Sequence, residues 1–190
     1  TLSTDYVFNG TGSVPYSPEM DSEPINYYGF SKKAGEQMAL AANSQTIIIR
    51  TSWVYSSHGN NFVKTMLRLM KERQELKVVD DQIGAPTYAA DLAMAILSMI
   101  QSLEKGNIHY GIYHYSNAGV ISWYQFALRI QELAGSSCHV LPQASANYPT
   151  PAKRPFYSVM DTSAIQKDFG IQLMDWDLSL QNCMQVLLNQ

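Results

Sequence analysis

Apolar residues along this chain recur at two spacings, one typical of buried strands and one typical of helices. Residues 46–55 open with Thr46-Ile47-Ile48-Ile49, a β-branched run expected of a parallel strand that is covered on both faces. A strand-like run at residues 3–8, a helix and this strand predict a right-handed parallel crossover. Apolar positions at helical spacing, or helix start signals, predict helices over 27–40, 61–73, 88–103 and 122–135.

Glycine, proline and small polar residues divide the rest of the chain. Asn26 and Ser122 are expected to cap the helices that follow them, and Gly170 is expected to close a helix over 162–169. Glycine- and proline-rich stretches predict loops over 9–25, 80–87 and 141–155. Short strands over 76–79, 111–116 and 158–160 and a last helix over 178–188 complete the pattern.

Composition narrows the classes of protein. With 46% hydrophobic and 15% charged residues, the chain reads as a globular protein with a real core. A net charge of −3 without a basic cluster argues against a nucleic-acid or anionic membrane partner. No apolar run approaches the ~18 residues of a membrane span, and no signal peptide is visible. Cys138 and Cys183 lack metal-ligand spacing, so we expect a cytoplasmic protein in a reducing setting.

Tyr28 and Lys32 are the first candidates for chemistry. They lie four residues apart in a predicted helix, and this spacing places two side chains on one face. An ammonium beside a phenol favours the phenolate, and such a tyrosine gives or takes a proton at a carbonyl or alcohol oxygen. An exposed helix face also produces this pair by chance, so the spacing alone leaves both interpretations open.

Further motifs add to this pair. The sequence from about residue 3 to 161 resembles the extended short-chain dehydrogenase/reductases and, within them, the dTDP-4-dehydrorhamnose reductase family. The resemblance rests on these blocks, in order: Ser3-Thr4-Asp5-Tyr6-Val7-Phe8, Tyr28-x-x-x-Lys32, Arg50-Thr51-Ser52-Trp53-Val54-Tyr55, Gly59-Asn60-Asn61-Phe62, Asp81-Gln82-x-Gly84-x-Pro86-Thr87 and Tyr148-Pro149-Thr150-Pro151-Ala152-x-Arg154-Pro155.

The resemblance implies an α/β fold. Residues 1–55 would form a partial Rossmann-like catalytic segment, the C-terminal part of a doubly wound parallel sheet. Residues 56–190 would form mainly a smaller α/β substrate-binding domain, with segments that return to the Rossmann-like domain. The chain holds no Gly-x-Gly-x-x-Gly turn, so by resemblance a cofactor-binding segment of roughly a hundred residues should precede it. We therefore expect this chain alone to bind a nicotinamide cofactor poorly and to be inactive.

The implied reaction is reduction of the C4 keto group of dTDP-4-dehydro-L-rhamnose to dTDP-L-rhamnose by NADPH or NADH. By resemblance, Thr4, Tyr28 and Lys32 are catalytic. Tyr28 would protonate the forming alkoxide, Thr4 would hydrogen-bond the same substrate oxygen, and Lys32 would assist Tyr28 and contact the nicotinamide ribose. Thr51 and Ser52 would join Tyr28 and Lys32 in binding the cofactor.

Five further residues are candidates for the nucleotide-sugar substrate. Tyr6 and Trp53 could form an aromatic wall, although residue type alone favours core packing for both. Asn61 and Gln82 suit hydrogen bonds to a nucleotide sugar. Arg154, in a proline-rich loop, suits a diphosphate as a fork-shaped donor, with a surface ion pair as the alternative.

Metal and partner predictions are sparse. Asp80-Asp81 lacks a third ligand nearby in sequence and is interpreted as a solvated turn, and His109, His114 and His139 are interpreted as structural. We predict no metal-binding residues in this chain. The sequence does not indicate which metal, if any, the protein uses. A homodimer is expected from the resemblance.

Two alternatives remain open. One is a non-catalytic regulatory subunit that keeps the fold and binds a nucleotide. The other is a different sugar-nucleotide reductase or epimerase. A dehydratase is disfavoured, because Thr4 is followed by Asp5-Tyr6 rather than by a pair of carboxylates.

Overall fold

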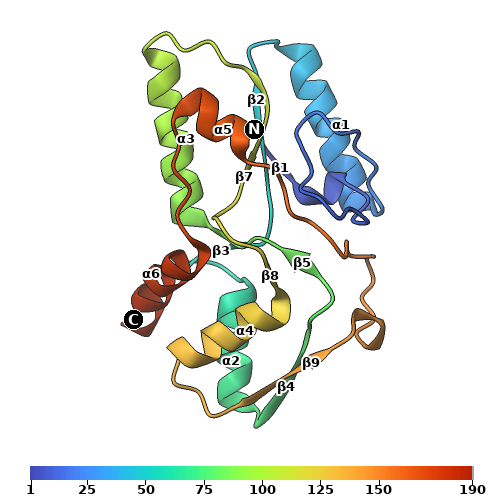
Figure 1. Ribbon diagram of the computed structural model, residues 1–190, viewed down its shortest axis with the longest axis vertical. Coiled ribbons are helices and arrows are strands. Elements are labelled where there is room, and N and C mark those ends of the chain that lie inside the picture. The colour runs from blue at the N-terminus through green and yellow to red at the C-terminus, as the bar shows by residue number, and fades with distance from the viewer. Residues whose placement is uncertain (190) are drawn as a thin grey trace.

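A three-stranded parallel sheet forms the centre of one half of the molecule. The computed structural model describes residues 1–189. Strands β1 (Leu2–Thr4), β2 (Ile47–Thr51) and β7 (Gly111–Tyr115) lie in the order β1-β2-β7. Helix α1 (Tyr27–Ala42) lies on one side of the sheet, and α3 (Ala89–Glu104) with α5 (Ser163–Phe169) lies on the other (Figure 1).

The β-branched run of β2 forms as its sequence predicts. Ile48 and Ile49 are both buried although they point to opposite faces, so the strand is covered on both sides. The predicted continuation to residue 55 is interrupted, because Trp53 adopts a φ of +48°. A separate short strand, β3 (Val54–Tyr55), follows this break.

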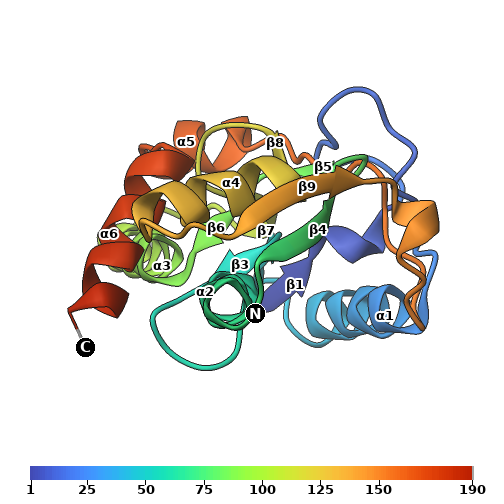
Figure 2. The same cartoon turned by 90° about the horizontal axis from the view of Figure 1, so that it is seen from below.

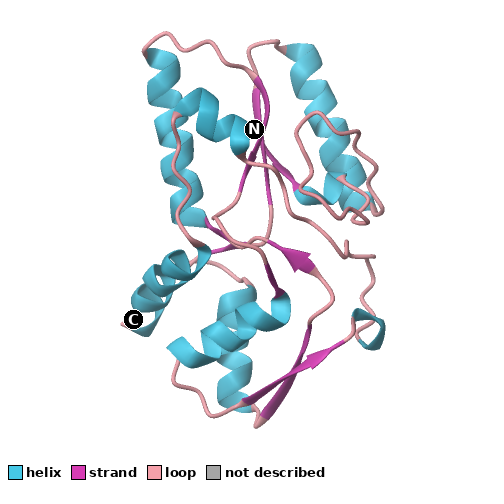
Figure 3. Ribbon diagram, viewed as in Figure 1, coloured by secondary structure: helices cyan, strands magenta, loops and turns pink. Residues whose placement is uncertain are grey.

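The second half of the molecule packs helices against a strand pair. Helices α2 (Phe62–Glu72), α4 (Trp123–Leu133) and α6 (Trp176–Leu188) surround a buried cluster that includes Phe126 and Leu180. Figure 3 shows the strands of this half as short pieces. They are β4 (Glu75–Val79) parallel to β9 (His139–Gln143), β3 parallel to β6 (Thr87–Tyr88), and β5 (Ile83–Gly84) antiparallel to β8 (Ile121–Ser122).

The chain passes between the two halves more than once. After β2 it builds β3, α2 and β4, returns to the sheet with α3 and β7, and leaves again for α4 and β9. Helix α5 then packs beside α3, and α6 ends the described chain in the second half (Figures 1 and 2). None of the helices in residues 1–189 has the length and apolarity that a membrane crossing requires.

Several further predicted boundaries are wrong, among them the loop over 80–87, which contains β5, and the last helix, which begins at Trp176. The strand-like run at residues 3–8 ends at Thr4, because the Thr4 side chain caps a 3-10 turn, η1 (Asp5–Val7). The strand predicted over 158–160 is only a bridge between Tyr16 and Met160. The loop predicted over 141–155 begins three residues later, since β9 continues through Pro142 to Gln143, and the edge position of β9 tolerates the proline.

The predicted helix caps are confirmed. The Asn26 side chain accepts a hydrogen bond from the Gly29 amide, and Ser122 forms a capping box with Gln125. Helix α5 ends at Gly170, whose φ of +66° suits a left-handed cap. These caps fix the helix starts that carry several candidate residues.

Candidate active site at the carboxyl ends of the parallel strands

Thr4 and Thr51 meet at the carboxyl ends of β1 and β2. The two residues are directly paired in the parallel register, and both are buried. Thr51 donates a hydrogen bond to the Thr87 hydroxyl at 3.2 Å, and Ser52 donates one to the Ala85 carbonyl at 2.8 Å. The hydroxyls of Thr51 and Ser52 therefore hold the loop before α3, and their role toward a cofactor remains a prediction.

A glycine brings Tyr28 close to η1, the turn that follows Thr4. A Cβ at Gly29 would lie 2.0 Å from the Tyr6 carbonyl oxygen, so only glycine lets the first turn of α1 contact η1 this closely. The Tyr28 ring then packs edge-on against the Tyr6 ring, with 5.7 Å between centroids. Tyr28 stays 53% exposed. Its hydroxyl is therefore placed where a ligand can reach it.

Lys32 lies on the same face of α1 and reaches back to β1. Its Nζ donates a hydrogen bond to the Leu2 carbonyl at 2.7 Å, two residues before Thr4. Of the predicted candidates, Thr4 ends β1 and Tyr28 lies in the first turn of α1, whereas the Lys32 ammonium bonds the first residue of β1.

Asp5 is a neighbour of Thr4 that sequence reasoning did not single out. Only 3% of its surface is exposed, and burial raises the pKa of its carboxyl to about 7. The Thr4 hydroxyl donates to Asp5 Oδ1 at 2.9 Å, and the Tyr6 amide donates to the Thr4 oxygen at 3.2 Å. A carboxylate between a strand and the apolar residues Val7 and Phe8 was the available signal.

A cavity of about 1200 Å³ opens in the second half of the molecule, between α2, β4 and the loop 144–156. Gln82 and Arg154, two of the predicted substrate residues, are among its lining residues. Basic residues outnumber acidic ones in this lining. Arg73, Lys77, Lys153 and Arg154 are the cations, and Glu75 and Asp81 are the anions.

Arg154 connects this cavity with the end of β1. Its side chain makes no hydrogen bond or ion pair with any of residues 1–189, so its donors are available. Burial raises the pKa of Tyr6, and the nearby positive charge of Arg154 partly opposes that rise. The guanidinium therefore lies near Tyr6 while it lines the cavity, and the alternative of a surface ion pair is not observed among residues 1–189.

Trp53 reaches the cavity through a second tryptophan. Its ring stacks on Trp123 with 3.6 Å between centroids and 11° between planes, and Trp123 lines the cavity. A Cβ at Gly84 would lie 2.6 Å from the Trp53 ring, so a glycine is needed behind it. Sequence reasoning treated Trp123 only as a helix start; an aromatic residue directly after an N-cap was the missed signal.

Asn61 has a structural task. Its side chain accepts from the Lys64 amide at the start of α2 and donates to the Ser56 carbonyl at 2.7 Å. It is not among the residues that line the cavity. Both ends of its amide are thus engaged within the protein, and its predicted substrate contact stays a prediction.

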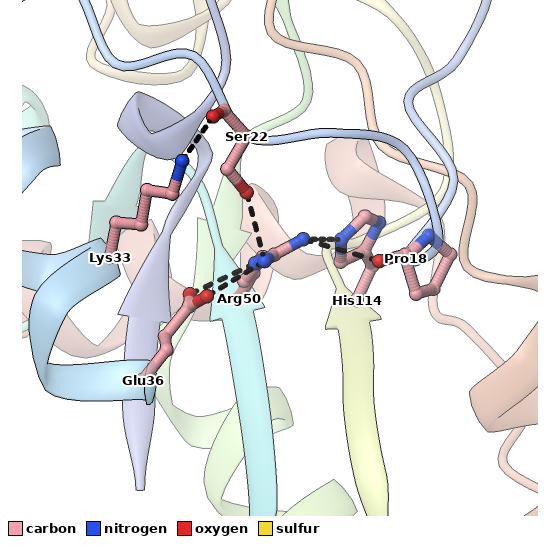
Figure 4. A network of polar contacts seen from close by, with 6 residues as sticks. All are labelled: Pro18, Ser22, Lys33, Glu36, Arg50 and His114. Carbon is pink, nitrogen blue, oxygen red and sulfur yellow. Dashed lines mark hydrogen bonds and ion pairs between the residues drawn. The ribbon is translucent and has the colours of Figure 1, made fainter. Parts of the chain in front are cut away.

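A buried polar network, which we call the Arg50 network, holds the loop 9–25 against the sheet. The Arg50 guanidinium donates to both Glu36 carboxylate oxygens, at 2.9 and 2.7 Å, and to the Ser22 hydroxyl at 3.2 Å (Figure 4). His114 lies beside it, and burial lowers the pKa of His114 to about 4. Lys33 adds a bond to the Ser22 carbonyl at 2.6 Å. Sequence reasoning missed Glu36 and Arg50 as a pair.

The loop 144–156 is tied to the start of α1. The Asn26 side chain, which caps α1, also donates to the Lys153 carbonyl at 2.9 Å. The Tyr157 amide donates to the Gly10 carbonyl, and a Cβ at Gly10 would lie 2.2 Å from the Pro155 side chain. These contacts keep the Arg154 loop beside Tyr28.

The two adjacent carboxylates of the loop 80–87 serve the local structure. Asp80 accepts a hydrogen bond from the Ser122 hydroxyl, and Asp81 accepts from the amide and hydroxyl of Ser145. Across residues 1–189, no group of three His, Cys, Asp or Glu side chains is arranged to hold a metal ion.

Comparisons with known proteins agree on one family. The family model described as RmlD substrate binding domain matches residues 1–189. A dTDP-4-dehydrorhamnose reductase of Aggregatibacter actinomycetemcomitans is 44% identical over 188 residues, which cover 95% of this chain and 64% of that protein.

Solved structures give the same result. A dTDP-4-dehydrorhamnose reductase of Clostridium acetobutylicum superposes with a TM-score of 0.92 at 40% identity, covering 98% of this chain and 65% of that one. The enzyme of Bacillus anthracis, solved in complex with NADP, gives a TM-score of 0.89 at 42% identity, covering 97% and 64%. The chain thus spans slightly less than two thirds of the length of these relatives.

Proposed function

This chain belongs to the RmlD substrate binding domain family, and we propose that it forms the catalytic and substrate-binding part of a nicotinamide-dependent reductase. The reaction is reduction of the C4 keto group of dTDP-4-dehydro-L-rhamnose to dTDP-L-rhamnose. One observation carries the proposal: Tyr28 packs on the turn that follows Thr4, Lys32 bonds β1 from the same face of α1, and Arg154 lies near that turn while it lines a large cavity with an excess of cations.

Tyr28 protonates the oxygen that forms at C4. Tyr28 is half exposed and lies at the start of α1, so a substrate oxygen can approach its hydroxyl. Thr4 hydrogen-bonds the same oxygen, and Lys32 supplies positive charge one helical turn behind Tyr28. These roles stabilise negative charge where it develops on the substrate.

The substrate lies between the end of β1 and the cavity. Arg154 binds the diphosphate with its free fork of donors, and the excess of cations in the cavity offsets the charge of that group. Gln82 hydrogen-bonds the nucleotide sugar. Trp53 and Trp123 form one rigid aromatic wall, with Tyr6 as a second aromatic contact.

A nicotinamide cofactor supplies the hydride when it is bound. The side chains of Tyr28 and Lys32 fit such a ligand, because Tyr28 is half exposed and Lys32 is half-buried on the same face of α1. Thr51 and Ser52 would contact it only after giving up their hydrogen bonds to Thr87 and Ala85. We favour NADPH over NADH because the relative of Bacillus anthracis was solved with NADP.

The remaining expectations complete the proposal. The full-length protein is a cytoplasmic homodimer in which a cofactor-binding segment joins this chain. A size measurement in solution, made at several concentrations, tests the dimer. A monomer at every concentration would remove that part of the proposal and leave the reaction untouched.

The test of the reaction uses the full-length protein with NADPH, then NADH, and dTDP-4-dehydro-L-rhamnose. Oxidation of the cofactor is followed by absorbance. Tyr28→Phe should lower kcat by about 10²–10⁴-fold, the usual contribution of general acid catalysis. Tyr27→Phe is the matched control, because Tyr27 is the preceding residue and is 85% exposed.

Three outcomes separate the interpretations. Loss of turnover in Tyr28→Phe but not in Tyr27→Phe supports the proposed role. Binding of the nucleotide sugar without any turnover would instead assign a regulatory subunit. Turnover of another 4-keto sugar nucleotide in preference to this one would assign a different reductase of the same fold.

A further inference from the structure

Asp5 is buried beside Thr4 with half of its carboxylate unpaired. Oδ1 accepts the Thr4 proton at 2.9 Å, whereas Oδ2 is buried and has no hydrogen-bond partner among residues 1–189. Buried polar groups are hydrogen-bonded in the great majority of cases, so an unpaired carboxylate oxygen beside a candidate catalytic residue asks for an explanation.

We propose that Asp5 is a positioning residue whose protonation state sets the direction of the Thr4 hydroxyl. Ionised Asp5 holds the Thr4 proton, whereas neutral Asp5 releases that proton toward the substrate oxygen. The inference rests on the proposed function of Thr4 as a donor to this oxygen.

The hydrogen-bonding capacity of one hydroxyl leads to this conclusion. A threonine hydroxyl has one proton and two lone pairs. In the structure its proton goes to Asp5 Oδ1, and one lone pair accepts the Tyr6 amide. Only a lone pair is left for a ligand, and a lone pair cannot stabilise a carbonyl oxygen that gains negative charge.

Protonation of Asp5 reverses this arrangement. A neutral carboxyl carries an O–H donor, which can donate to the remaining Thr4 lone pair. The Thr4 proton is then free to turn toward the substrate. The proton on Asp5 comes from solvent and stays on Asp5 throughout, so no bond to the substrate forms or breaks at this residue.

The surroundings of Asp5 favour the neutral form near neutral pH. Burial raises the pKa of Asp5 to about 7, although the bound Thr4 hydroxyl favours its charged form, as does the nearby Ser158 hydroxyl, whose proton goes to the Ile83 carbonyl at 3.3 Å rather than to Asp5 Oδ2. Tyr6, on the same turn, is the titratable neighbour of Asp5, and Tyr28 from α1 and Arg154 from the loop 144–156 stand around Tyr6 in turn.

The first experiment measures kcat of the full-length protein from pH 6 to pH 9. For the wild type we expect kcat to fall on the order of tenfold as pH rises through about 7, because Thr4 then turns away from the substrate. Asp5→Asn should show no such fall, since an amide cannot ionise but can donate to Thr4. Thr4→Ser should keep the wild-type profile, and Thr4→Val should be slow and flat.

The second experiment needs no turnover. The Asp5 carboxyl is titrated by ¹³C NMR in wild type, Thr4→Val and Thr51→Val. The wild-type midpoint should lie near 7, and Thr4→Val should raise it, because the Thr4 hydroxyl favours the charged form. Thr51→Val is the matched control; its hydroxyl bonds Thr87 instead, so the midpoint should not move.

These results distinguish the inference from the proposed function. A midpoint near 3.8, or one that Thr4→Val leaves unchanged, overturns the inference. So does an Asp5→Asn profile that still falls like the wild type. If turnover is absent and the midpoint moves as expected, the proposed reaction fails while the coupling of Thr4 to Asp5 stands. If Asp5→Asn does not fold, the Thr4→Val titration alone decides.

Discussion

Two buried polar clusters start from neighbouring positions of the same pair of strands, and they differ in how completely they are paired. Arg50 is paired with Ser3 in the register of β1 and β2. In the Arg50 network its guanidinium donates to both carboxylate oxygens of Glu36 and to the Ser22 hydroxyl. One residue further along, Thr4 leads into Asp5, whose Oδ2 has no partner within the described chain.

The difference separates a structural cluster from a functional one. Paired charges offset much of their desolvation and fix one arrangement of α1, β2 and the loop 9–25. An unpaired buried carboxyl destabilises the fold and shifts its own protonation equilibrium. A residue of this second kind beside a candidate catalytic threonine is a functional candidate, whereas Arg50 is better explained by packing.

Breaking the Arg50 network should have the largest effect on stability. Glu36→Leu leaves a buried guanidinium without its carboxylate, and removing one partner of a buried pair costs about 3–5 kcal/mol. The measurement is the denaturant midpoint by circular dichroism. A midpoint equal to that of the wild type would contradict the structural role of the pair.

Two further variants serve as controls for this prediction. Glu36→Leu combined with Arg50→Met should recover much of the loss, because no unpaired charge remains. Glu72→Ala breaks the exposed pair with Arg68 and should change stability by less than ~0.5 kcal/mol.

Removing the Asp5 charge should have the opposite sign. A carboxyl whose pKa rises from 3.8 to about 7 on folding lowers stability by up to roughly 4 kcal/mol above pH 7. Below pH 3.8 the carboxyl is neutral in both states, and the stability that its neutral form contributes is fully present. That contribution to stability is lost as pH rises through 7. Asp5→Asn should therefore raise the denaturant midpoint at pH 8. An equal or lower midpoint at pH 8 would sink this prediction.

His114 should respond to pH in the opposite direction to Asp5. Its pKa falls from 6.5 to about 4 on folding, so it contributes stability above pH 6.5 that is lost as pH drops through 4. The loss is up to roughly 3 kcal/mol. His114→Gln keeps hydrogen-bonding groups without titrating in this range, and its midpoint should fall less than that of the wild type between pH 7 and pH 4. Parallel curves would contradict the assignment.

Two glycines of α1 give the smallest and most closely matched comparison. Gly29→Ala places a Cβ 2.0 Å from the Tyr6 carbonyl oxygen and should destabilise by about 1–3 kcal/mol while it moves Tyr28 away from Thr4. A Cβ at Gly35 meets nothing within 4 Å, so Gly35→Ala should stabilise by about 0.5–1 kcal/mol. Unchanged activity in Gly29→Ala would show that this contact does not position Tyr28.

Local chemistry was predictable where one residue determines one feature. Asn26 and Ser122 cap their helices because a short polar side chain satisfies free amides at a helix start. The β-branched run of β2 is buried on both faces, because consecutive isoleucines place an apolar side chain on each face of the sheet. The pairing of Thr4 with Thr51 agrees with the predicted parallel crossover, since parallel strands end at one edge of their sheet.

The sequence by itself thus determined the parallel strands β2 and β7, the helix starts at Asn26 and Ser122, and the resemblance that marks Thr4, Tyr28 and Lys32. Only the tertiary structure decided which polar groups are paired. Arg50 lies 14 residues from Glu36, Arg154 lies near Tyr6 although most of the chain separates them, and Trp123 stacks on Trp53 from another element. Pairing and burial depend on contacts between distant segments, and these contacts fix the pKa of a carboxyl such as Asp5; no local pattern contains them.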